Sequence, residues 1–400
     1  MSRSGGGHGV RRVSMKALDA GLGERKRRHL YRTRRLSASA QQVVMHIDGR
    51  QLISFCSNDY LGLANHHEIK QAFIQAANDY GVGSGASHLI SGHHKLHHQL
   101  EEALAEFTGY PRALLFSTGY MANLGVIQAL TGRGDTVLED RLNHASLLDG
   151  ALLSGARLMR YAHNDVAQLK DKLQTRHSGE KLVVSDAVFS MDGDLAPIAQ
   201  LVASCRAHDA WLMLDDAHGF GVLGEDGKGS LQHSQTAPTA VPVYMATLGK
   251  ALGTAGAFVA ADEALIDTLI QQARTYVYTT AQPPAIAAAT LQALRIVQRD
   301  DGRRQRLQQN IRVFKSLAQQ AGIALLDSDT AIQPVIVGDA AKALRLSNAL
   351  LDAGLLVTAI RPPTVPEGSA RLRITLCAEH EATHIERLCS VLAREIQAFC

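Results

Sequence analysis

Short apolar runs alternate with amphipathic helical periods along the chain from about Arg112 onward. The apolar runs are RALLFST, DTVLED, ARLMRYA, KLVVSDAVFS, WLMLDDAHG, PVYMATLG and GAFVAAD. Strands that alternate with helices of ten or more residues indicate βαβ units, and hence a mostly parallel sheet covered by helices on both faces. Because ligands bind at the carboxyl ends of such strands, we expect the functional residues directly after the apolar runs.

The pattern changes after Ala281. A helical stretch from Pro283 to Gly322 predicts one long connector, and the runs IQPVIVG, LLVTAI and ARLRITL, with two amphipathic helices, predict a small α+β unit. The sequence therefore predicts an N-terminal arm over residues 1–50, a large domain over 51–285, and a connector helix with a small C-terminal domain over 286–400.

Length and composition fit a globular protein with more than one core. The chain has 400 residues, of which 46% are hydrophobic and 20% charged. No apolar run reaches the roughly 18 residues of a membrane span. Five cysteines, an odd number without a C-x-x-C pair, favour reduced thiols: Cys56, Cys205, Cys377, Cys389 and Cys400.

Basic residues concentrate at the N-terminus. Residues 1–35 contain eleven Lys or Arg against Asp19 and Glu24, although the whole chain has a formal charge of only +3. The arm lacks the interleaved aromatics of a nucleic-acid binder and the apolar core of a secretion signal, so a solvated arm on a cytoplasmic protein is favoured over nucleic-acid binding or a transit peptide.

Three stretches resemble common ligand-binding motifs, but the residues around each of them do not favour that function. GVGSGA (81–86) matches a dinucleotide-binding loop, but a helical pattern precedes it instead of a strand. Gly249-Lys250 lacks the rest of a phosphate-binding P-loop. HHKLHH (93–98) places histidines at i, i+4 spacing that could ligate a metal, yet a histidine-rich surface helix is the favoured interpretation, and no metal is expected.

The run WLMLDDAHG ends in two carboxylates and a histidine. Alternation places Asp215 and Asp216 on opposite faces of the strand, so at most one of them shares a site with His218. A strand-end aspartate that caps the next helix is the structural alternative. Two acids before a glycine-rich turn favour a functional role.

Lys250 is the only charged residue in the apolar, glycine-rich stretch YMATLGKALGTAGAFVA. It follows a later strand of the same predicted sheet and should emerge at the same edge as Asp215. A buried lysine loses its charge readily, and a neutral amine attacks carbonyl groups. A Schiff base with an aldehyde would explain why the amine is buried.

Pyridoxal 5′-phosphate (PLP) is an aldehyde that also requires a carboxylate near its pyridine nitrogen and a binding site for its phosphate, and the sequence offers both. Asp215 would keep its pyridine nitrogen protonated. The backbone N–H groups of Gly119 and Tyr120 open a predicted helix after a strand, which favours a phosphate, and Thr247 and Ser190 add hydroxyl groups. The sequence therefore predicts a PLP site.

At these residues the chain resembles the α-oxoamine synthases among the fold-type I PLP enzymes. The resemblance extends from about Leu18 to the C-terminus through SNDYLGL, FSTGYMAN, NHAS, FSMDGDLAP, DDAHGFGVLG, TLGKALG and RPPTVPEGSARLRITL, in that order. It implies an α/β fold with a mostly parallel central sheet in a large domain, a small α+β C-terminal domain, and a PLP-dependent acyltransferase that joins C-acylation to decarboxylation.

The resemblance also implies the roles of individual residues. Lys250 would bind the cofactor aldehyde, Asp215 the pyridine nitrogen and His218 the phenolic oxygen, while His144 would stack over the ring and act in catalysis. The phosphate would contact Gly119, Tyr120, Ser190, Thr247 and, from a second subunit, Thr280. The amino-acid carboxylate would bind Arg361 and Asn58, and the acyl substrate would bind Arg32 and Thr364.

Two stretches, GSGASHLISGHHKLHHQLE and RPPTVPEG, resemble one branch of this family, and that resemblance implies the substrates L-alanine and a pimeloyl thioester, carried as pimeloyl-CoA or on an acyl-carrier protein. The nearest alternative is a sister enzyme that acylates glycine or serine with another acyl-CoA. A ligand-sensing regulator and an NAD-dependent oxidoreductase are the alternatives from other classes. The implied assembly is a cytoplasmic homodimer with its site at the subunit interface, without nucleic-acid or membrane partners.

Overall fold

The computed structural model describes residues 17–175 and 178–399. Residues 1–16 of the basic arm and Cys400 lie outside these residues, so the expectations for them stay untested. Among the described cysteines, Cys56, Cys205, Cys377 and Cys389 are free, as the sequence predicts for reduced thiols. In the same residues no helix combines the length and the apolar character that a membrane crossing requires.

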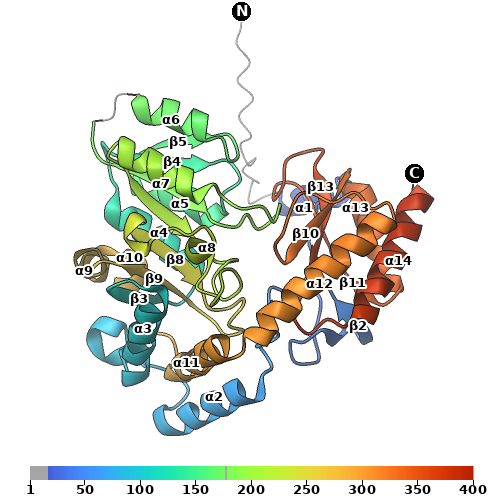
Figure 1. Cartoon of the computed structure of the whole chain (residues 1–400), viewed down its shortest axis with the longest axis horizontal. Helices are drawn as coiled ribbons and strands as arrows, with labels where there is room; N and C mark the ends of the chain where they lie inside the picture. The colour runs from blue at the N-terminus through green and yellow to red at the C-terminus, as the bar shows by residue number, and fades with distance from the viewer. Residues whose placement is uncertain (1–16, 176–177, 400) are drawn as a thin grey trace, which may run out of the picture.

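A seven-stranded sheet forms the centre of the larger part of the molecule (Figure 1), in the order β3-β9-β8-β7-β6-β4-β5. Only β9 runs against its neighbours, and the other pairings among β4 to β8 are parallel. The predicted mostly parallel sheet is confirmed. The strands are β3 (Arg112–Phe116), β4 (Thr136–Asp140), β5 (Arg157–Tyr161), β6 (Lys181–Asp186), β7 (Trp211–Asp215), β8 (Val243–Thr247) and β9 (Ala257–Ala261).

The central strands are apolar almost throughout because both faces of the sheet are buried. Successive residues belong to different cores: Leu114 and Met213 to one, Leu115 and Leu214 to the other. Helices cover both faces (Figure 1). They are α2 (His67–Tyr80), α3 (Lys95–Thr108), α4 (Gly119–Leu130), α5 (Ala145–Ser154), α6 (Val166–Gln174), α7 (Ile198–Ala207), α8 (Ser230–His233), α9 (Glu263–Gln272), α10 (Arg274–Val277) and α11 (Pro284–Arg299).

Two three-stranded sheets form the smaller part. One has the order β10-β13-β12 and is antiparallel, and the other has the order β1-β2-β11. The β1–β2 hairpin thus joins a strand from the C-terminal quarter of the chain, a long-range pairing that the sequence pattern did not indicate. The elements are β1 (Val44–Ile47), β2 (Arg50–Ser54), β10 (Ile332–Gly338), β11 (Leu355–Leu356), β12 (Thr358–Ile360), β13 (Ala370–Thr375), α13 (Ala340–Asp352) and α14 (Ala382–Phe399).

The expected single connector helix is two helices, α11 and α12 (Asp301–Gln320). Asp300 leaves the helical conformation with φ −114° and ψ 76°, and its carboxylate accepts a hydrogen bond of 3.1 Å from Arg303 Nε. The residues RDDG at the break include aspartate and glycine, which are poor helix formers. In Figure 1, α12 runs diagonally from the end of α11 towards α14.

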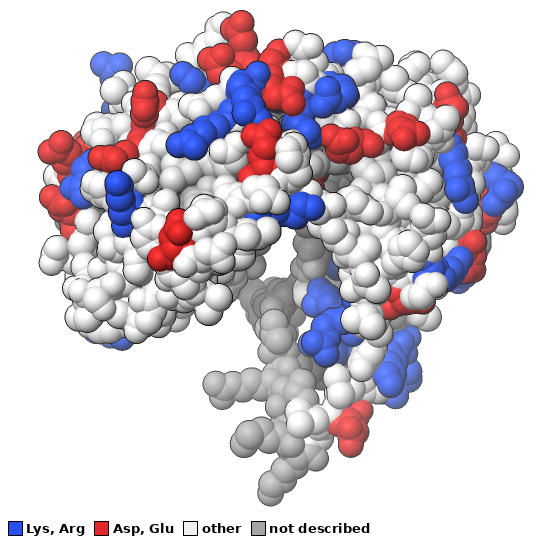
Figure 2. Space-filling model, turned by 90° about the horizontal axis from the view of Figure 1, so that it is seen from below, with Lys and Arg blue, Asp and Glu red and all other residues white. Residues whose placement is uncertain are grey.

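The described part of the basic arm contains one helix, α1 (Leu18–Arg27), in which no residue is buried. Its neighbour Arg28 pairs with Glu367 at 3.1 Å. Figure 2 shows Lys and Arg interspersed with Asp and Glu over one face of the body. That face therefore carries no large field of a single sign of the kind that a nucleic-acid surface presents.

Candidate active site

A cavity of about 390 Å³ lies at the carboxyl ends of β7 and β8, closed on one side by residues of β12 and β13. This is the edge at which a parallel sheet binds ligands. It brings together nine of the residues singled out from the sequence: Asn58, Gly119, Tyr120, His144, Ser190, Asp215, His218, Thr247 and Lys250.

Lys250 follows the end of β8 by three residues and points into this cavity, where Nζ donates a hydrogen bond of 3.1 Å to Thr247 Oγ1. Burial lowers the pKa of the amine, although the carboxylates of Asp215 and Asp186 oppose the shift. The chain then turns back into β9, and a Cβ at Gly253 (φ +68°) would come within 2.3 Å of the Ala64 nitrogen. Strand β9 pairs antiparallel with β8 in the same sheet.

Asp215 and Asp216 lie on opposite faces of the sheet, as alternation predicted. Asp215 Oδ2 accepts a hydrogen bond of 2.7 Å from Asn123 Nδ2, and Oδ1 accepts one of 3.0 Å from the Ala217 amide. Asp216 points away from the cavity and accepts hydrogen bonds from Ser230 and Tyr244. Burial raises the pKa of Asp216 to about 6. Of these two aspartates, only Asp215 faces the cavity that contains Lys250.

The N-terminus of α4 meets the end of β8. Thr118 caps the helix by accepting a hydrogen bond of 3.1 Å from the Met121 amide, and the amides of Gly119 and Tyr120 are the first two of the helix, which have no intrahelical acceptor. A Cβ at Gly119 would lie 2.6 Å from Thr247 Cγ2. The close approach places the helix amides and the Thr247 hydroxyl side by side, an arrangement that suits an anion.

Ser190 reaches the cavity from a loop and not from a strand end. The apolar run KLVVSDAVFS extends to Ser190, but β6 ends at Asp186. The chain beyond it folds back on itself, because Val188 forms an isolated bridge with Leu195 and Gly193 turns with φ +75°. The loop brings Ser190 to the cavity.

Two histidines flank the cavity with neutral rings. His144 caps α5: its Nδ1 accepts a hydrogen bond of 3.3 Å from the Ser146 amide. His218 Nδ1 lies 2.6 Å from the hydroxyl of Tyr60. Burial lowers the pKa of both rings, and for His218 the positive charges of Lys250 and Arg373 lower it further.

Three residues of the cavity were missed by sequence reasoning: Asn123, Asp186 and Arg373. Asp186 is buried, accepts a hydrogen bond of 3.1 Å from the His144 amide, and has its pKa raised by burial. Arg373 is the only arginine among the described residues that line the cavity, and its side chain donates to Asn58 Oδ1 at 3.1 Å and to the Ser190 carbonyl at 2.6 Å. The available signal was the pair of arginines inside the apolar strand ARLRITL, since a buried charge in a strand needs a partner.

The structure does not place Arg361 with Asn58. Arg361 follows β12, and its guanidinium donates to the carbonyls of His29 and Tyr31 in the arm. It lines a second cavity of about 350 Å³ together with Arg32 and Thr364, which share a hydrogen bond of 3.1 Å. This cavity adjoins the first one, because Thr358 and Ile360 line both.

Thr280 lines neither cavity of this chain. It is exposed in the segment between α10 and α11. Nothing in a single chain tests the expected contact across a subunit interface.

The first cavity fits PLP by its donor set. A buried amine, an oriented carboxylate and a helix N-terminus line the same cavity, and the cavity volume lies in the range of small-ligand sites. Asn123 Oδ1 and Asp186 Oδ1 are buried in the cavity wall and have no hydrogen-bond partner among the described residues. Unpaired buried acceptors favour a ligand that carries donors of its own.

Known proteins resemble the chain over almost its whole length. Residues 50–392 match the family model described as aminotransferase class I and II. The 8-amino-7-oxononanoate synthase of Thioalkalivibrio sulfidiphilus is 57% identical over 96% of this chain and 98% of the relative. The protein of the same name from Nitrosococcus oceani is 58% identical over 93% of this chain and 99% of the relative.

Solved structures agree in fold. Serine palmitoyltransferase of Sphingomonas wittichii superposes with a TM-score of 0.91 at 33% identity, covering 96% of this chain and 98% of that chain. The 8-amino-7-oxononanoate synthase of Francisella tularensis superposes with a TM-score of 0.77 at 33% identity, covering 87% and 98%. A structure described as SPT with PLP, 31% identical, has a TM-score of 0.88 and covers 96% of this chain and 95% of that chain.

The resemblance read from the motifs, the fold class and the cofactor are confirmed. The enzyme uses PLP and acts on an amino acid and an acyl thioester. The chain belongs to the aminotransferase class I and II family and, within it, to the 8-amino-7-oxononanoate synthases.

Proposed function

We propose that this enzyme condenses L-alanine with a pimeloyl thioester, with loss of carbon dioxide, to give 8-amino-7-oxononanoate for biotin synthesis. The relatives at 57% and 58% identity that carry this name support the choice over the serine palmitoyltransferases, which are 30–33% identical. The observation that carries the proposal is the single cavity that contains Lys250, Asp215 and the N-terminus of α4.

The cofactor would be held at three points. Lys250 would bind its aldehyde, and Asp215, oriented by Asn123, would pair with its pyridine nitrogen. The amides of Gly119 and Tyr120 would bind the phosphate. The hydroxyls of Ser190 and Thr247 would assist there, and His218 would contact the phenolic oxygen. Bound PLP supplies an electron sink for the pair left on the substrate Cα atom when its proton is removed.

Arg373 and Asn58 would hold the carboxylate of the amino acid. A guanidinium binds a carboxylate through two parallel hydrogen bonds, and Arg373 is the guanidinium that faces this cavity. The bond between Arg373 and Asn58 keeps both side chains in place before the substrate arrives. The resemblance gave Arg361 this role, but Arg361 lies in the adjoining cavity.

Lys250 would move the proton at Cα. Its pKa is lowered by burial, so a larger fraction of the amine is neutral near neutral pH and can accept a proton. The hydrogen bond to Thr247 orients Nζ within the cavity. The same nitrogen would later return a proton to the product.

His144 would stabilise the oxygen of the thioester carbonyl. Because its Nδ1 accepts from the Ser146 amide, the proton of the neutral ring resides on Nε2. An N–H group fixed before the reaction stabilises negative charge as it develops on an oxygen atom. Arg32 and Thr364, which are bonded to each other in the adjoining cavity, would contact the acyl substrate.

The assembly would be a cytoplasmic homodimer. Thr280, which is exposed and lines neither of the two cavities described above, would extend from one subunit to the phosphate site of the other. A division into an arm (1–50), a large domain (51–285) and a C-terminal unit (286–400) is retained as part of this proposal.

The test is a comparison of substrates with the PLP-loaded protein. Alanine, glycine and serine are each incubated with pimeloyl-CoA, pimeloyl-carrier protein and palmitoyl-CoA, and the products are identified by mass spectrometry. We expect 8-amino-7-oxononanoate from alanine and a pimeloyl thioester to form fastest. Faster turnover of glycine or serine with palmitoyl-CoA would instead identify the sister activity.

A further inference from the structure

Histidines crowd the segment that leads into α3. His88, His93, His94, His97 and His98 lie within eleven residues, and Glu101 follows one turn later. The sequence interpretation, a surface helix with His93 above His97, is wrong in two respects. Helix α3 begins only at Lys95, so His93 precedes it, and His97 is fully buried. The proposed activity uses none of these side chains.

Two overlapping groups have the spacing of metal ligands. His88, His93 and His97 form one, and His93, His98 and Glu101 form the other, each with its ligand atoms within 4.8 Å of one another. They share His93. Hydrogen bonding decides between them.

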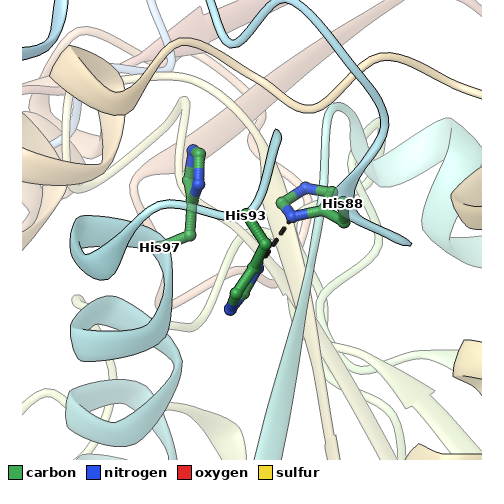
Figure 3. Close-up of side chains that lie close together, drawn as sticks. All are labelled: His88, His93 and His97. Carbon is green, nitrogen blue, oxygen red and sulfur yellow. Dashed lines mark hydrogen bonds between the residues drawn. The ribbon is translucent and has the colours of Figure 1, made fainter. Parts of the chain in front are cut away.

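The first group is already engaged in hydrogen bonds. His97 Nδ1 accepts from the His94 amide at 3.0 Å, and His97 Nε2 lies 2.8 Å from the Gln282 carbonyl, which can only accept. Both nitrogens of His97 are therefore used. His88 Nδ1 and His93 Nδ1 lie 2.9 Å apart and share a proton (Figure 3). A metal in this group would have to break these bonds.

The ligand atoms of the second group lie within 4.8 Å of one another, and one ligand residue has a further contact, that of His98 Nε2 with Glu102 Oε1 at 3.4 Å. With Nδ1 of His93 bonded to His88, Nε2 lies 3.8 Å from Glu101 Oε2. The other oxygen, Glu101 Oε1, accepts a hydrogen bond of 3.0 Å from the Leu115 amide of β3. Histidine and carboxylate ligands of metals have their remaining polar atoms fixed in this way.

We propose that His93, His98 and Glu101 bind a divalent transition-metal ion of the Zn²⁺ type, with His88 and the Leu115 amide orienting two of the ligands. Two imidazoles and one carboxylate are a ligand set that Zn²⁺ accepts in tetrahedral sites, with water in the fourth position. His93 and His98 are both exposed, so the ion can enter from solvent.

The site would brace a segment next to the one that carries Thr280. His97 is bonded to the Gln282 carbonyl, to which Ser84 also donates at 2.6 Å, and the Ala281 amide donates to Ala86 at 3.0 Å. His88 stacks on Tyr276 with ring centroids 5.1 Å apart. The role is therefore structural, and bound metal should raise the thermal midpoint of the protein.

The experiment measures Zn²⁺ binding to the full-length, PLP-loaded protein without a polyhistidine tag, in competition with a chromogenic chelator. We expect one ion per chain and, with Co²⁺ in its place, the visible absorption of a tetrahedral site. His98→Ala and Glu101→Gln should each weaken binding at least about tenfold. Glu102→Gln is the matched control on the same helix, since it removes the other carboxylate near His98, at 3.4 Å, and should bind as the unaltered protein does.

Two results would overturn the proposal. One is no binding by the unaltered protein. The other is unchanged binding in His98→Ala, which would assign the ion to His88, His93 and His97. The His98 side chain is 64% exposed, so its removal should not impair folding, and an unchanged cofactor spectrum would confirm this.

Discussion

Arg373 and Asn58 stand 315 positions apart in the chain, and Arg373 Nη1 donates a hydrogen bond of 3.1 Å to Asn58 Oδ1 at the wall of the cavity. The same guanidinium holds the Ser190 carbonyl through Nε. One arginine of β13 thereby connects the C-terminal sheet to the two loops that border the cavity of the large sheet. The contact places a positive charge where a substrate carboxylate would bind.

This contact predicts that substitution of Arg373 raises KM for alanine and that substitution of Arg361 does not. Arg373→Lys removes the two-pronged hydrogen bonding of a guanidinium and should raise KM for alanine about tenfold or more. Arg361→Lys is the matched control, and it should leave KM for alanine within about twofold because Arg361 faces the adjoining cavity. Initial rates over a range of alanine concentrations measure both. The opposite ranking of the two variants would restore the role that the resemblance gave to Arg361.

The positions of Arg361 and Arg373 show which site residues a sequence pattern cannot predict. The strand runs and the residues directly after them predicted the large sheet, Lys250, Asp215 and the start of α4, because a parallel sheet brings its strand ends to one edge. Arg373 lies within a strand of another sheet. The residues that Arg373 contacts in the cavity depend on how β12 and β13 pack against the large sheet. The hydrophobic periodicity of a strand does not encode this packing.

The contact between Gly119 and Thr247 predicts a defect with a specific rescue. In Gly119→Ala the new Cβ would lie 2.6 Å from Thr247 Cγ2, so the start of α4 must move away from the end of β8. We expect Kd for PLP to rise about tenfold, because the helix amides lose their position. Thr247→Ser in the same chain removes the methyl group and keeps the hydroxyl, and it should restore most of the affinity. Fluorescence titration with PLP measures Kd for the unaltered protein, for Gly119→Ala and for the double variant. Equal Kd values for the unaltered protein and Gly119→Ala would show that the contact does not position the phosphate site.

The bond from Asn123 to Asp215 predicts a loss in the chemical step. Asn123→Ala removes the donor to Oδ2 of the carboxylate, and bonds to charged groups contribute roughly 1.5–3 kcal/mol, which corresponds to a tenfold to hundredfold fall in kcat. Ser146→Ala is the control, since it removes the other partner of Asn123 and a contact of 2.7 Å with His144 Nδ1, but no contact of Asp215. The fall should be clearly smaller in the control. Equal rates for the two variants would mean that Asp215 needs no orientation by Asn123.

The residues around Asp215 also show what a single sequence withholds. Asn123 lies one turn into α4, at a position where an apolar helix pattern gives no reason to expect a site residue. It reaches Asp215 from the other wall of the cavity, where Asn123 Nδ2 donates a hydrogen bond of 2.7 Å to Asp215 Oδ2. For the histidines near α3, the sequence indicated more helix than the structure has. Their spacing predicted a helix over 93–98, but α3 begins only at Lys95.

Covalent attachment of the cofactor should be confined to Lys250. Borohydride reduction of the PLP-loaded protein followed by digestion should yield one peptide carrying a pyridoxyl group, at position 250. Lys250→Ala should lose this label, together with at least about 100-fold in kcat, because the same amine serves as the base at Cα. Labelling at another lysine would show that the wrong nucleophile has been assigned.

His163 predicts a pH dependence of stability. Its ring lies between two carboxylates, with Nδ1 3.1 Å from Asp140 Oδ1 and Nε2 2.7 Å from Asp194 Oδ2, and it thereby joins the end of β4 to the loop that carries Ser190. Burial opposes protonation, but the hydrogen bonds and charges of the two carboxylates outweigh it and raise the pKa of His163 to about 10. The folded protein therefore binds a proton that the unfolded chain releases near its ordinary value of 6.5.

The stabilisation by this proton is complete below pH 6.5 and is lost as the pH rises towards 10. The urea midpoint of the unaltered protein should accordingly fall between pH 7 and pH 10, and His163→Gln, which cannot bind the proton, should show a smaller fall over the same range. Since other groups titrate in that window, the difference between the two proteins is the measure. Parallel curves would mean that His163 is neutral in the folded state, and that the Ser190 loop is held without a charged bridge.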